Sequence, residues 1–175
     1  LVTCLASLLQ DQGKIVEAEK YLRKGLSLYE ESCGTDSPET IDTVVKLGKL
    51  LEIRDKIDEA VQLFRRENQA TEDALGADHV DSLLSKNRLA RALIKLGGVQ
   101  NKTEAESLMR KTLEICKSKY DTKHPRYEKS LDDLIDLLYK TSKFSEAEKL
   151  CRQSLKLKDD RSQSSRETIA CMYYR

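Results

Sequence analysis

The chain has 175 residues, with 31 Lys and Arg against 30 Asp and Glu, and its formal net charge is +1. This balance excludes a global electrostatic drive toward nucleic acid or acidic membranes. Charged residues make up 35% of the chain and aromatic residues 5%, with two prolines in all, which favours solvated helices over a disordered chain or a β fold.

The dipeptide Glu-Ala recurs four times, and its alanines are spaced by 42, 45 and 42 residues, at Ala18, Ala60, Ala105 and Ala147. A leucine precedes these alanines by 13, 13, 16 and 13 residues, at Leu5, Leu47, Leu89 and Leu134. A fixed period of this size predicts a repeat protein whose units stack and present one long surface. Such a surface favours a binding scaffold over a catalyst with a single deep pocket.

Each repeat is expected to form two amphipathic helices. Leu5, Leu8 and Leu9 have the i, i+3, i+4 spacing of one buried stripe, and the second half continues this period from Ala18 to Leu22. The pattern predicts an all-α chain of about nine helices, at residues 1–12, 15–33, 37–54, 57–75, 79–97, 102–120, 124–141, 144–158 and 164–175.

Capping and helix-terminating residues indicate where the expected helices begin and end. Gly34 and Gly76 follow second helices, where a left-handed residue can end a helix. Ser37 precedes a proline and is expected to cap the next helix, and Asn101 is expected to cap the sixth. The third repeat is three residues longer, and we expect residues 97–101 to hold this insertion as a longer loop.

A repeat array buries its core between neighbouring units, so we expect one continuous domain over residues 1–175 without a linker. The chain begins inside a helix and ends within a repeat, which predicts a fragment of a longer protein. The expected units cover residues 1–34, 35–76, 77–121 and 122–161, with a partial unit at 162–175.

The cysteines predict a reducing compartment, because they are odd in number, scattered and without a CxxC pair. They stand at Cys4, Cys33, Cys116, Cys151 and Cys171, with Cys151 on the expected buried face of its helix. No signal peptide and no apolar run of bilayer-spanning length is visible. The chain is therefore expected to be cytoplasmic, with no membrane partner.

Catalytic chemistry has no clear basis in the sequence. The two histidines, His79 and His124, are 45 residues apart and so occupy the same helix-start position in successive repeats. Neither a zinc-ligand cluster nor a phosphate-binding glycine motif is present. We expect no enzyme activity, no metal and no cofactor.

The repeats resemble the tetratricopeptide repeat (TPR) family, in which the first helix carries Leu and then a small residue, and the second helix an early Ala. The pairs that fit are Leu5-Ala6, Leu47-Gly48 and Leu89-Ala90, whereas the fourth repeat departs with Leu134-Ile135. The basic family period is about 34 residues. The longer period here suggests helices about one turn longer.

The longer form resembles the repeats of the kinesin light chain. That likeness is carried by a Gly-Lys turn at Gly13, by Glu-Ala-Glu at residues 17–19, 104–106 and 146–148, and by the loops that end at His79 and at His124-Pro125. The resemblance implies a right-handed solenoid of stacked antiparallel helix pairs. It also implies that first helices line a concave groove, which binds a peptide or a helix of another protein.

The groove positions implied by this resemblance differ from the family pattern. Of the paired Asn residues that the kinesin light chain carries there, only Asn87 is retained. Positive charge gathers in repeats 2 and 3 at Lys46, Lys49, Arg88, Arg91 and Lys95, and carboxylates follow in repeat 4 at Asp132, Asp133 and Asp136. One hypothesis is a bipolar groove that receives an acidic peptide segment. The alternative is that these residues form solvated faces or pair with one another.

Repeat 2 carries Glu67-Asn68 where the other repeats have Gly25-Leu26, Thr112-Leu113 and Ser154-Leu155. A buried polar pair without partners would be costly. Our preferred interpretation is repeat degeneracy. The alternatives are a loosely packed, flexible joint, or partners supplied by a different helix or another chain.

The sequence therefore predicts a non-catalytic adaptor that binds a protein or peptide. The alternative is a structural or regulatory solenoid that packs against other domains of a larger switch protein. Nucleic acid is not expected, because the chain lacks a basic aromatic face. We expect a monomer, or a weak dimer formed through Ile169, Met172 and Tyr173 of the terminal helix.

Overall fold

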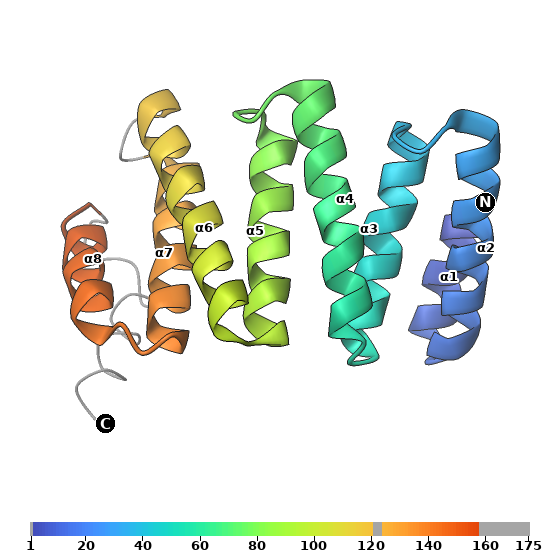
Figure 1. Cartoon of the computed structure of the whole chain (residues 1–175), viewed down its shortest axis with the longest axis horizontal. Helices are drawn as coiled ribbons and strands as arrows, with labels where there is room; N and C mark the ends of the chain where they lie inside the picture. The colour runs from blue at the N-terminus through green and yellow to red at the C-terminus, as the bar shows by residue number, and fades with distance from the viewer. Residues whose placement is uncertain (1, 121–123, 158–175) are drawn as a thin grey trace. The chain divides into compact units, whose positions relative to one another are not determined.

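The computed structural model describes residues 2–120 and 124–157, which form helices joined by short turns (Figure 1). The prediction of an all-α fold is confirmed. The helices within the described residues are α1 (Val2–Asp11), α2 (Ile15–Cys33), α3 (Pro38–Ile53), α4 (Ile57–Leu75), α5 (Val80–Leu96), α6 (Val99–Lys119), α7 (Pro125–Lys140) and α8 (Phe144–Leu157). The expected ninth helix, at residues 164–175, lies outside the described residues.

The chain forms two compact units, an N-terminal unit over Leu1–Leu96 and a C-terminal unit over Gly97–Arg175. In the N-terminal unit each helix from α1 to α4 packs against the next one, and in the C-terminal unit α7 packs against both α6 and α8. Within each unit, helices joined by a turn run antiparallel, as the sequence predicts (Figure 1). One continuous domain over residues 1–175 stays a prediction.

Three predicted helix ends are confirmed. Gly34 and Gly76 follow α2 and α4 with φ of 91° and 88°, a left-handed conformation that glycine adopts without strain. At the start of α3, the Ser37 Oγ accepts a hydrogen bond from the Thr40 amide at 3.2 Å. Local sequence thus defines these ends independently of tertiary packing.

The expected start of the sixth helix is wrong. α6 begins at Val99 and includes Asn101, whose side-chain amide donates a hydrogen bond to the Gly97 carbonyl oxygen at 2.7 Å. The three inserted residues therefore lengthen the helix rather than the loop, and only Gly97 and Gly98 separate α5 from α6. Positive φ at both glycines gives the tight turn that allows the early helix start.

The two histidines lie at helix starts, as the sequence predicts, and the structure shows that their side chains cap the helices. The Nδ1 atoms of His79 and His124 accept hydrogen bonds from the amides of Asp81 and Arg126, both at 3.2 Å. Each imidazole therefore satisfies an amide that has no partner within the helix.

The core combines a small residue on one helix of a repeat with a larger one on the other. The first-helix residues are Ala6, Gly48, Ala90 and Ile135, the second-helix residues are Leu22, Phe64, Met109 and Cys151, and all are buried. A Cβ atom on Gly48 would lie 2.6 Å from the Phe64 ring. The smallest first-helix residue therefore accompanies the largest second-helix residue, and Ile135 in the fourth repeat accompanies the small Cys151.

One part of the predicted buried stripe is wrong. Leu5 and Leu8 of α1 are 40% and 58% exposed, although Leu47 and Leu50 at the same positions of α3 are buried. Helix α3 is covered by both α2 and α4, whereas α1 packs mainly against α2. The amphipathic pattern is the same, but burial depends on a second neighbouring helix.

The Glu-Ala-Glu motif connects successive repeats through ion pairs. We call this cluster, in which a buried glutamate bonds to basic side chains of its own helix and of the following turn, the ionic staple. Glu19 of α2 is 5% exposed and accepts hydrogen bonds from Arg23 in its own helix at 2.9 Å, and from Arg54 and, at 3.1 Å, Lys56 in the α3–α4 turn. Arg23 also pairs with Glu59 at the start of α4. The glutamates on both sides of the recurring alanine therefore hold adjacent second helices together.

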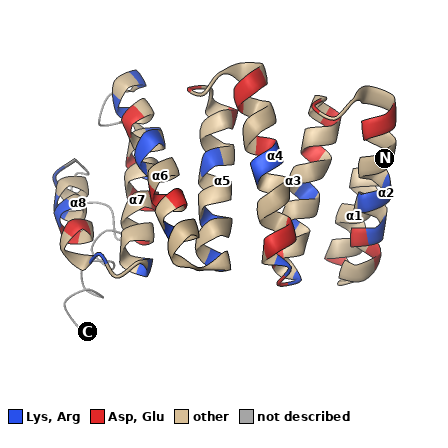
Figure 2. Cartoon of the chain, viewed as in Figure 1, with Lys and Arg blue, Asp and Glu red and all other residues tan. Residues whose placement is uncertain are grey.

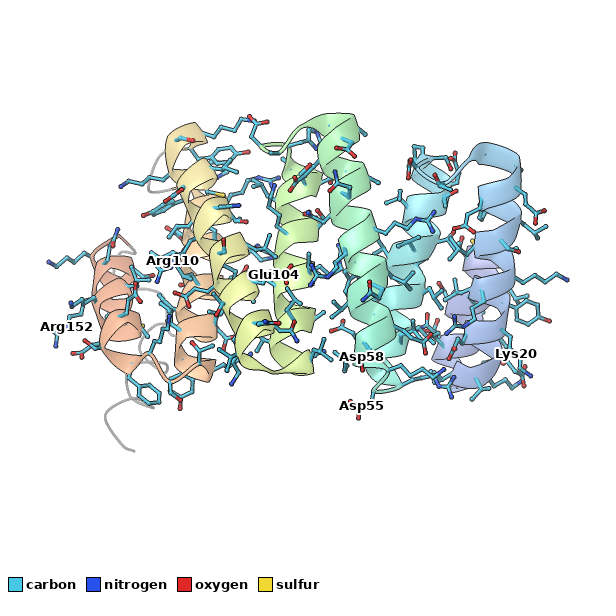
Figure 3. All side chains as sticks on the ribbon, viewed as in Figure 1. Lys20, Asp55, Asp58, Glu104, Arg110 and Arg152 are labelled. Atoms are coloured by element: carbon cyan, nitrogen blue, oxygen red, sulfur yellow. The ribbon has the colours of Figure 1, made fainter. Side chains whose placement is uncertain are left out.

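The same staple recurs in the C-terminal unit. Glu106 of α6 accepts hydrogen bonds from Arg110 at 2.8 Å and from Lys143 in the α7–α8 turn at 2.7 Å. Arg110, labelled in Figure 3, donates to Glu146 of α8 at 2.6 Å. Repeat 2 has Val61 at the position of Glu19, so its sequence does not provide this carboxylate.

The staple lowers the pKa of its central carboxyl group. Burial of Glu19 opposes ionisation, but hydrogen bonds from Arg54, Arg23 and Lys56 outweigh it and lower the pKa to about 2. The pKa of Glu106 is also lowered, where burial is opposed by Lys143 and Arg110. Ionised staples therefore stabilise the folded chain at neutral pH.

We expect Gly48→Ala to destabilise the chain by about 1 to 3 kcal/mol, because the new methyl group overlaps the Phe64 ring. The change is measured as the free energy of urea unfolding by circular dichroism. Adding Phe64→Leu recreates the Ala6–Leu22 combination of repeat 1 and should recover much of the loss. Stabilisation by Gly48→Ala, the usual effect inside a helix, would contradict this account.

We expect Glu19→Gln to reduce the free energy of unfolding by about 2 kcal/mol at pH 7, a value discounted for the partial exposure of its partners. Because the folded pKa lies below the unfolded one, this difference should persist above pH ~4.5 and shrink as the pH falls toward 2. Urea unfolding at pH 7, 4 and 3 measures it. The exposed Glu17→Gln is the control, and an equal effect of both variants at every pH would count against the staple.

Candidate functional site

The N-terminal unit contains a groove between its two parallel first helices, α3 and α5. One wall is a stripe along α3 that includes Ile41, Val45 and Lys49, and the other is a stripe along α5 at Asp81, Leu84 and Arg88. The groove opens into a pocket of about 530 Å³, whose floor is formed by α4 at Glu67, Ala70, Thr71, Ala74 and Leu75. The Lys95 ammonium and the Glu52 carboxylate join the far ends of the two walls at 2.9 Å.

Polar side chains hold the floor against the α5 wall. Glu67 is 4% exposed, and its Oε1 pairs with the Arg88 guanidinium. Asn68 accepts a hydrogen bond from Ser85 Oγ at 3.2 Å and donates one to Glu72 at 3.2 Å. Both residues of the irregular Glu67-Asn68 pair are therefore bonded to charged or polar groups.

A second set of bonds extends this polar interface toward the α4–α5 turn. Ser85 also lies 3.0 Å from the Thr71 hydroxyl, and Ser82 donates to the Thr71 carbonyl oxygen at 3.1 Å. The buried Lys86 ammonium pairs with Glu72 at 2.7 Å and donates to the Ala77 carbonyl oxygen at 2.8 Å. The contact between α4 and α5 is thus held by a hydrogen-bond network.

The preferred interpretation of Glu67-Asn68 as mere repeat degeneracy is wrong. A different helix supplies the partners, which was one of the alternatives, since α5 presents Ser85 and Arg88 opposite the pair. Desolvation raises the pKa of Glu67, while the Arg88 guanidinium acts in the opposite direction. The pair is therefore a matched feature of two helices that fixes Arg88 at the edge of the pocket.

The structure places the five predicted basic residues differently from one another. Lys49 and Arg88 line the pocket together. Lys46 pairs with Asp42 one turn earlier at 2.6 Å, and Lys95 pairs with Glu52. Arg91 is exposed on α5, one turn beyond Arg88. Three of the five basic side chains, including that of Arg88, thus pair with carboxylates of the same unit.

The remaining predicted residues do not join this pocket. Asn87 is half-buried on α5, beside the pocket stripe. Asp132 accepts a hydrogen bond from Ser154 at 3.4 Å and Asp136 pairs with Lys140 at 2.6 Å, both within the C-terminal unit. Asp133 is half-buried on the same helix, α7. A groove whose charge changes sign between repeats 3 and 4 stays a prediction.

Sequence reasoning missed the acidic end of the pocket. Asp36, Asp42 and Asp81 lie near the N-terminal ends of the two walls, where helix dipoles favour carboxylates. Asp42 and Asp81 each precede a basic pocket residue, Lys49 or Arg88, by seven residues. This shared spacing puts an acidic and a basic residue about two turns apart on one face of each helix. It was the signal in the sequence that would have revealed the change from acidic to basic along the groove.

Acidic and basic residues are interspersed along the helices of both units (Figure 2). Within residues 2–120 and 124–157, no three or more His, Cys, Asp and Glu side chains are grouped so that they could hold a metal. None of the helices in these residues has the length and apolar character needed to cross a membrane.

These features define a repeat protein built from antiparallel helix pairs. Two tetratricopeptide repeat profiles match the sequence, one over residues 1–67 and the other over residues 82–126. The chain belongs to the tetratricopeptide repeat family, as its sequence predicts.

Two fungal relatives are similar in sequence. Clustered mitochondria protein homologs from Aspergillus niger and Ajellomyces capsulatus are 26% and 28% identical to this chain over 151 and 149 residues. The matches cover 86% and 85% of this chain. The chain spans only 12% of the length of each of these relatives.

Solved structures agree with the fold. Nearly identical TPR-like repeats from Podosopora anserina, described as a kinesin light chain, match with a TM-score of 0.81 and 22% identity, over 90% of this chain and 74% of that one. BtubC (BKLC) from P. vanneervenii matches with a TM-score of 0.75 and 13% identity, over 89% of this chain and 61% of that one. The resemblance to kinesin-light-chain-like repeats is therefore confirmed for the fold.

We expect Arg88→Met to destabilise the chain by about 3 kcal/mol, because it leaves the buried Glu67 carboxylate without its ion pair. Combining it with Glu67→Gln removes that charge and should restore part of the stability. Urea unfolding of wild type, both single variants and the double variant gives the coupling energy. Strict additivity of the two changes would show that the pair is not coupled.

Proposed function

We propose that the chain is a non-catalytic interaction scaffold that binds a peptide or helix of another protein in the groove between α3 and α5. TPR domains generally serve as protein-interaction scaffolds. The observation that carries the proposal is the pocket of about 530 Å³, which has charged groups at two ends and apolar walls between them. Leu84 on one wall is 40% exposed, so it offers apolar area for a partner to cover.

The proposed contacts for an acidic segment of the partner lie at the basic end of the groove. Lys49 is an exposed residue of the α3 wall, and Arg91 is exposed on α5, one turn beyond Arg88. Arg88 is engaged by Glu67, so its role is to add positive potential while it holds the floor. Lys46 and Lys95 contribute less, because each is paired with a carboxylate.

The absence of catalytic activity is part of the same proposal. Its support is that both histidines bond to helix-start amides through Nδ1, which gives them a structural role. TPR repeats are typically non-catalytic. Three expectations stay predictions: that the chain is cytoplasmic, that it does not bind nucleic acid, and that it is a monomer or a weak dimer.

A second candidate is a structural or regulatory array inside a longer protein. Its support is that the chain spans 12% of the length of its fungal relatives, and that Leu5 and Leu8 on α1 are exposed. In this case a neighbouring domain would cover α1. Hydrogen exchange that is slower in α1 of a longer protein than in this chain would favour the second candidate.

We expect the double variant Lys49→Glu and Arg91→Glu to weaken binding of groove-directed peptides at least about tenfold, since it reverses two exposed charges on the helices that flank the groove. A phage-displayed library of natural peptides selected on the wild-type chain supplies the ligands, and fluorescence anisotropy measures the Kd. Arg88 stays unchanged, because its reversal would place two carboxylates side by side at the buried floor.

The matched control is the double variant Lys20→Glu and Lys24→Glu, which has the same change in charge on α2. Both lysines are exposed, and Lys20 lies on the outer side of α2 (Figure 3). This control should bind like wild type. Equal affinity of wild type and both variants would refute binding at the groove. Equal weakening in both variants would show that the effect comes from the net charge of the chain and not from the groove.

A further inference from the structure

The floor of the pocket contains a buried acceptor that the chain does not use. Glu67 Oε1 pairs with Arg88, but Glu67 Oε2 is buried and has no hydrogen-bond partner among the described residues. Glu67 is also one of the residues that line the pocket. Buried polar atoms are nearly always bonded, so this oxygen marks a position where a donor is missing.

The charge of the lining favours a cation as that donor. Four carboxylates, at Asp36, Asp42, Glu67 and Asp81, face two basic groups, at Lys49 and Arg88. Asp42 is already paired with Lys46, and Asp81 lies 3.6 Å from His79 Nδ1, but the Asp42 and Asp81 side chains remain 55% and 60% exposed. An incoming positive charge therefore lowers the electrostatic energy of the pocket, whereas a further carboxylate raises it at the floor.

The walls favour a cation on a long aliphatic stem. Apolar residues line the pocket beside these carboxylates, at Ile41, Val45 and Leu84 on the walls and at Ala74 and Leu75 on the floor. A volume of about 530 Å³ is many times the roughly 30 Å³ of a water molecule, so an extended side chain fits. Arginine and lysine bury such stems along apolar surface while the charged head finds its partner.

We propose that this pocket receives an arginine side chain of the bound partner, with its guanidinium donating to Glu67 Oε2 and to a rim aspartate. The inference rests on the proposed function, since the arginine belongs to the peptide that the groove binds. Arginine fits better than lysine because its planar head presents several donors in fixed directions. Acidic residues of the same partner then meet the exposed Lys49 and Arg91.

The test uses N-acetyl-arginine amide as the probe, titrated into the ¹⁵N-labelled chain and followed by amide chemical shifts. N-acetyl-norleucine amide has a similar stem without charge, and N-acetyl-glutamate amide has the opposite charge. We expect saturable shifts at Val45, Thr71 and Leu84 with the arginine probe, and binding at least about tenfold weaker for the other two. Because the probe is a single residue, the result does not depend on peptide binding along the rest of the groove.

Two variants and a control locate the contact. Glu67→Gln keeps the shape of the floor and should weaken the arginine probe at least about tenfold, and the exposed Asp81→Asn about fivefold. Asp58→Asn, an exposed carboxylate at the start of α4 and outside the pocket, should change nothing (Figure 3). If Glu67→Gln does not fold, Asp81→Asn and its control still decide the question.

Equal binding of the arginine and norleucine probes would overturn the inference in favour of an apolar pocket, and tighter binding of the glutamate probe would reverse its sign. Absence of shifts at the pocket residues would also overturn it. None of these results would disprove the wider proposal of a peptide groove, which fails only if the Lys49 and Arg91 reversal leaves selected peptides bound.

Discussion

The buried ion pair between Glu67 and Arg88 constrains how α4 packs against α5 in the N-terminal unit. A carboxylate that is 4% exposed is costly unless a cation meets it, so α4 and α5 can pack only in the register that brings these two groups together. That register also brings Ser85 to Asn68 and Lys86 to Glu72. The same contact forms the floor and one wall of the pocket, so the site and the packing between repeats 2 and 3 depend on one interaction.

Successive repeats in this chain are joined in two chemically different ways. After the first and third repeats, a Glu-Ala-Glu carboxylate accepts hydrogen bonds from the turn of the following repeat, as Glu19 and Glu106 do. Repeat 2 has Val61 instead, and its polar contacts to the next repeat come from Glu67, Asn68, Thr71 and Glu72 of α4. A change of one residue in a repeated motif thus coincides with a change in where the polar contacts between repeats lie. The pocket occurs at the repeat that departs from the pattern.

Several charged side chains of the predicted basic face form ion pairs within the N-terminal unit, so they are less available to a bound partner. Lys46 and Lys95 belong to the predicted basic face, yet each pairs with a carboxylate of its own unit. Lys49 and Arg91 are exposed, and Glu67 carries an acceptor oxygen without a partner among the described residues. The charge of the groove in the N-terminal unit therefore changes along the helices, from acidic at Asp36, Asp42 and Asp81 to basic at the opposite end. This arrangement favours a partner that carries both signs of charge.

The sequence by itself determined the helices, because their signals are local: apolar spacing, the Ser37 cap and the glycines after α2 and α4 act within a few residues. It also determined the family, since the period and the Leu and Ala positions recur in register. It misplaced the start of α6 and the burial of Leu5 and Leu8, because helix extension and burial depend on neighbouring turns and helices. Only the tertiary structure decided that α5 supplies the hydrogen-bond partners of Glu67 and Asn68. Residues that are 17 to 21 positions apart in the sequence come into contact only when two helices pack together.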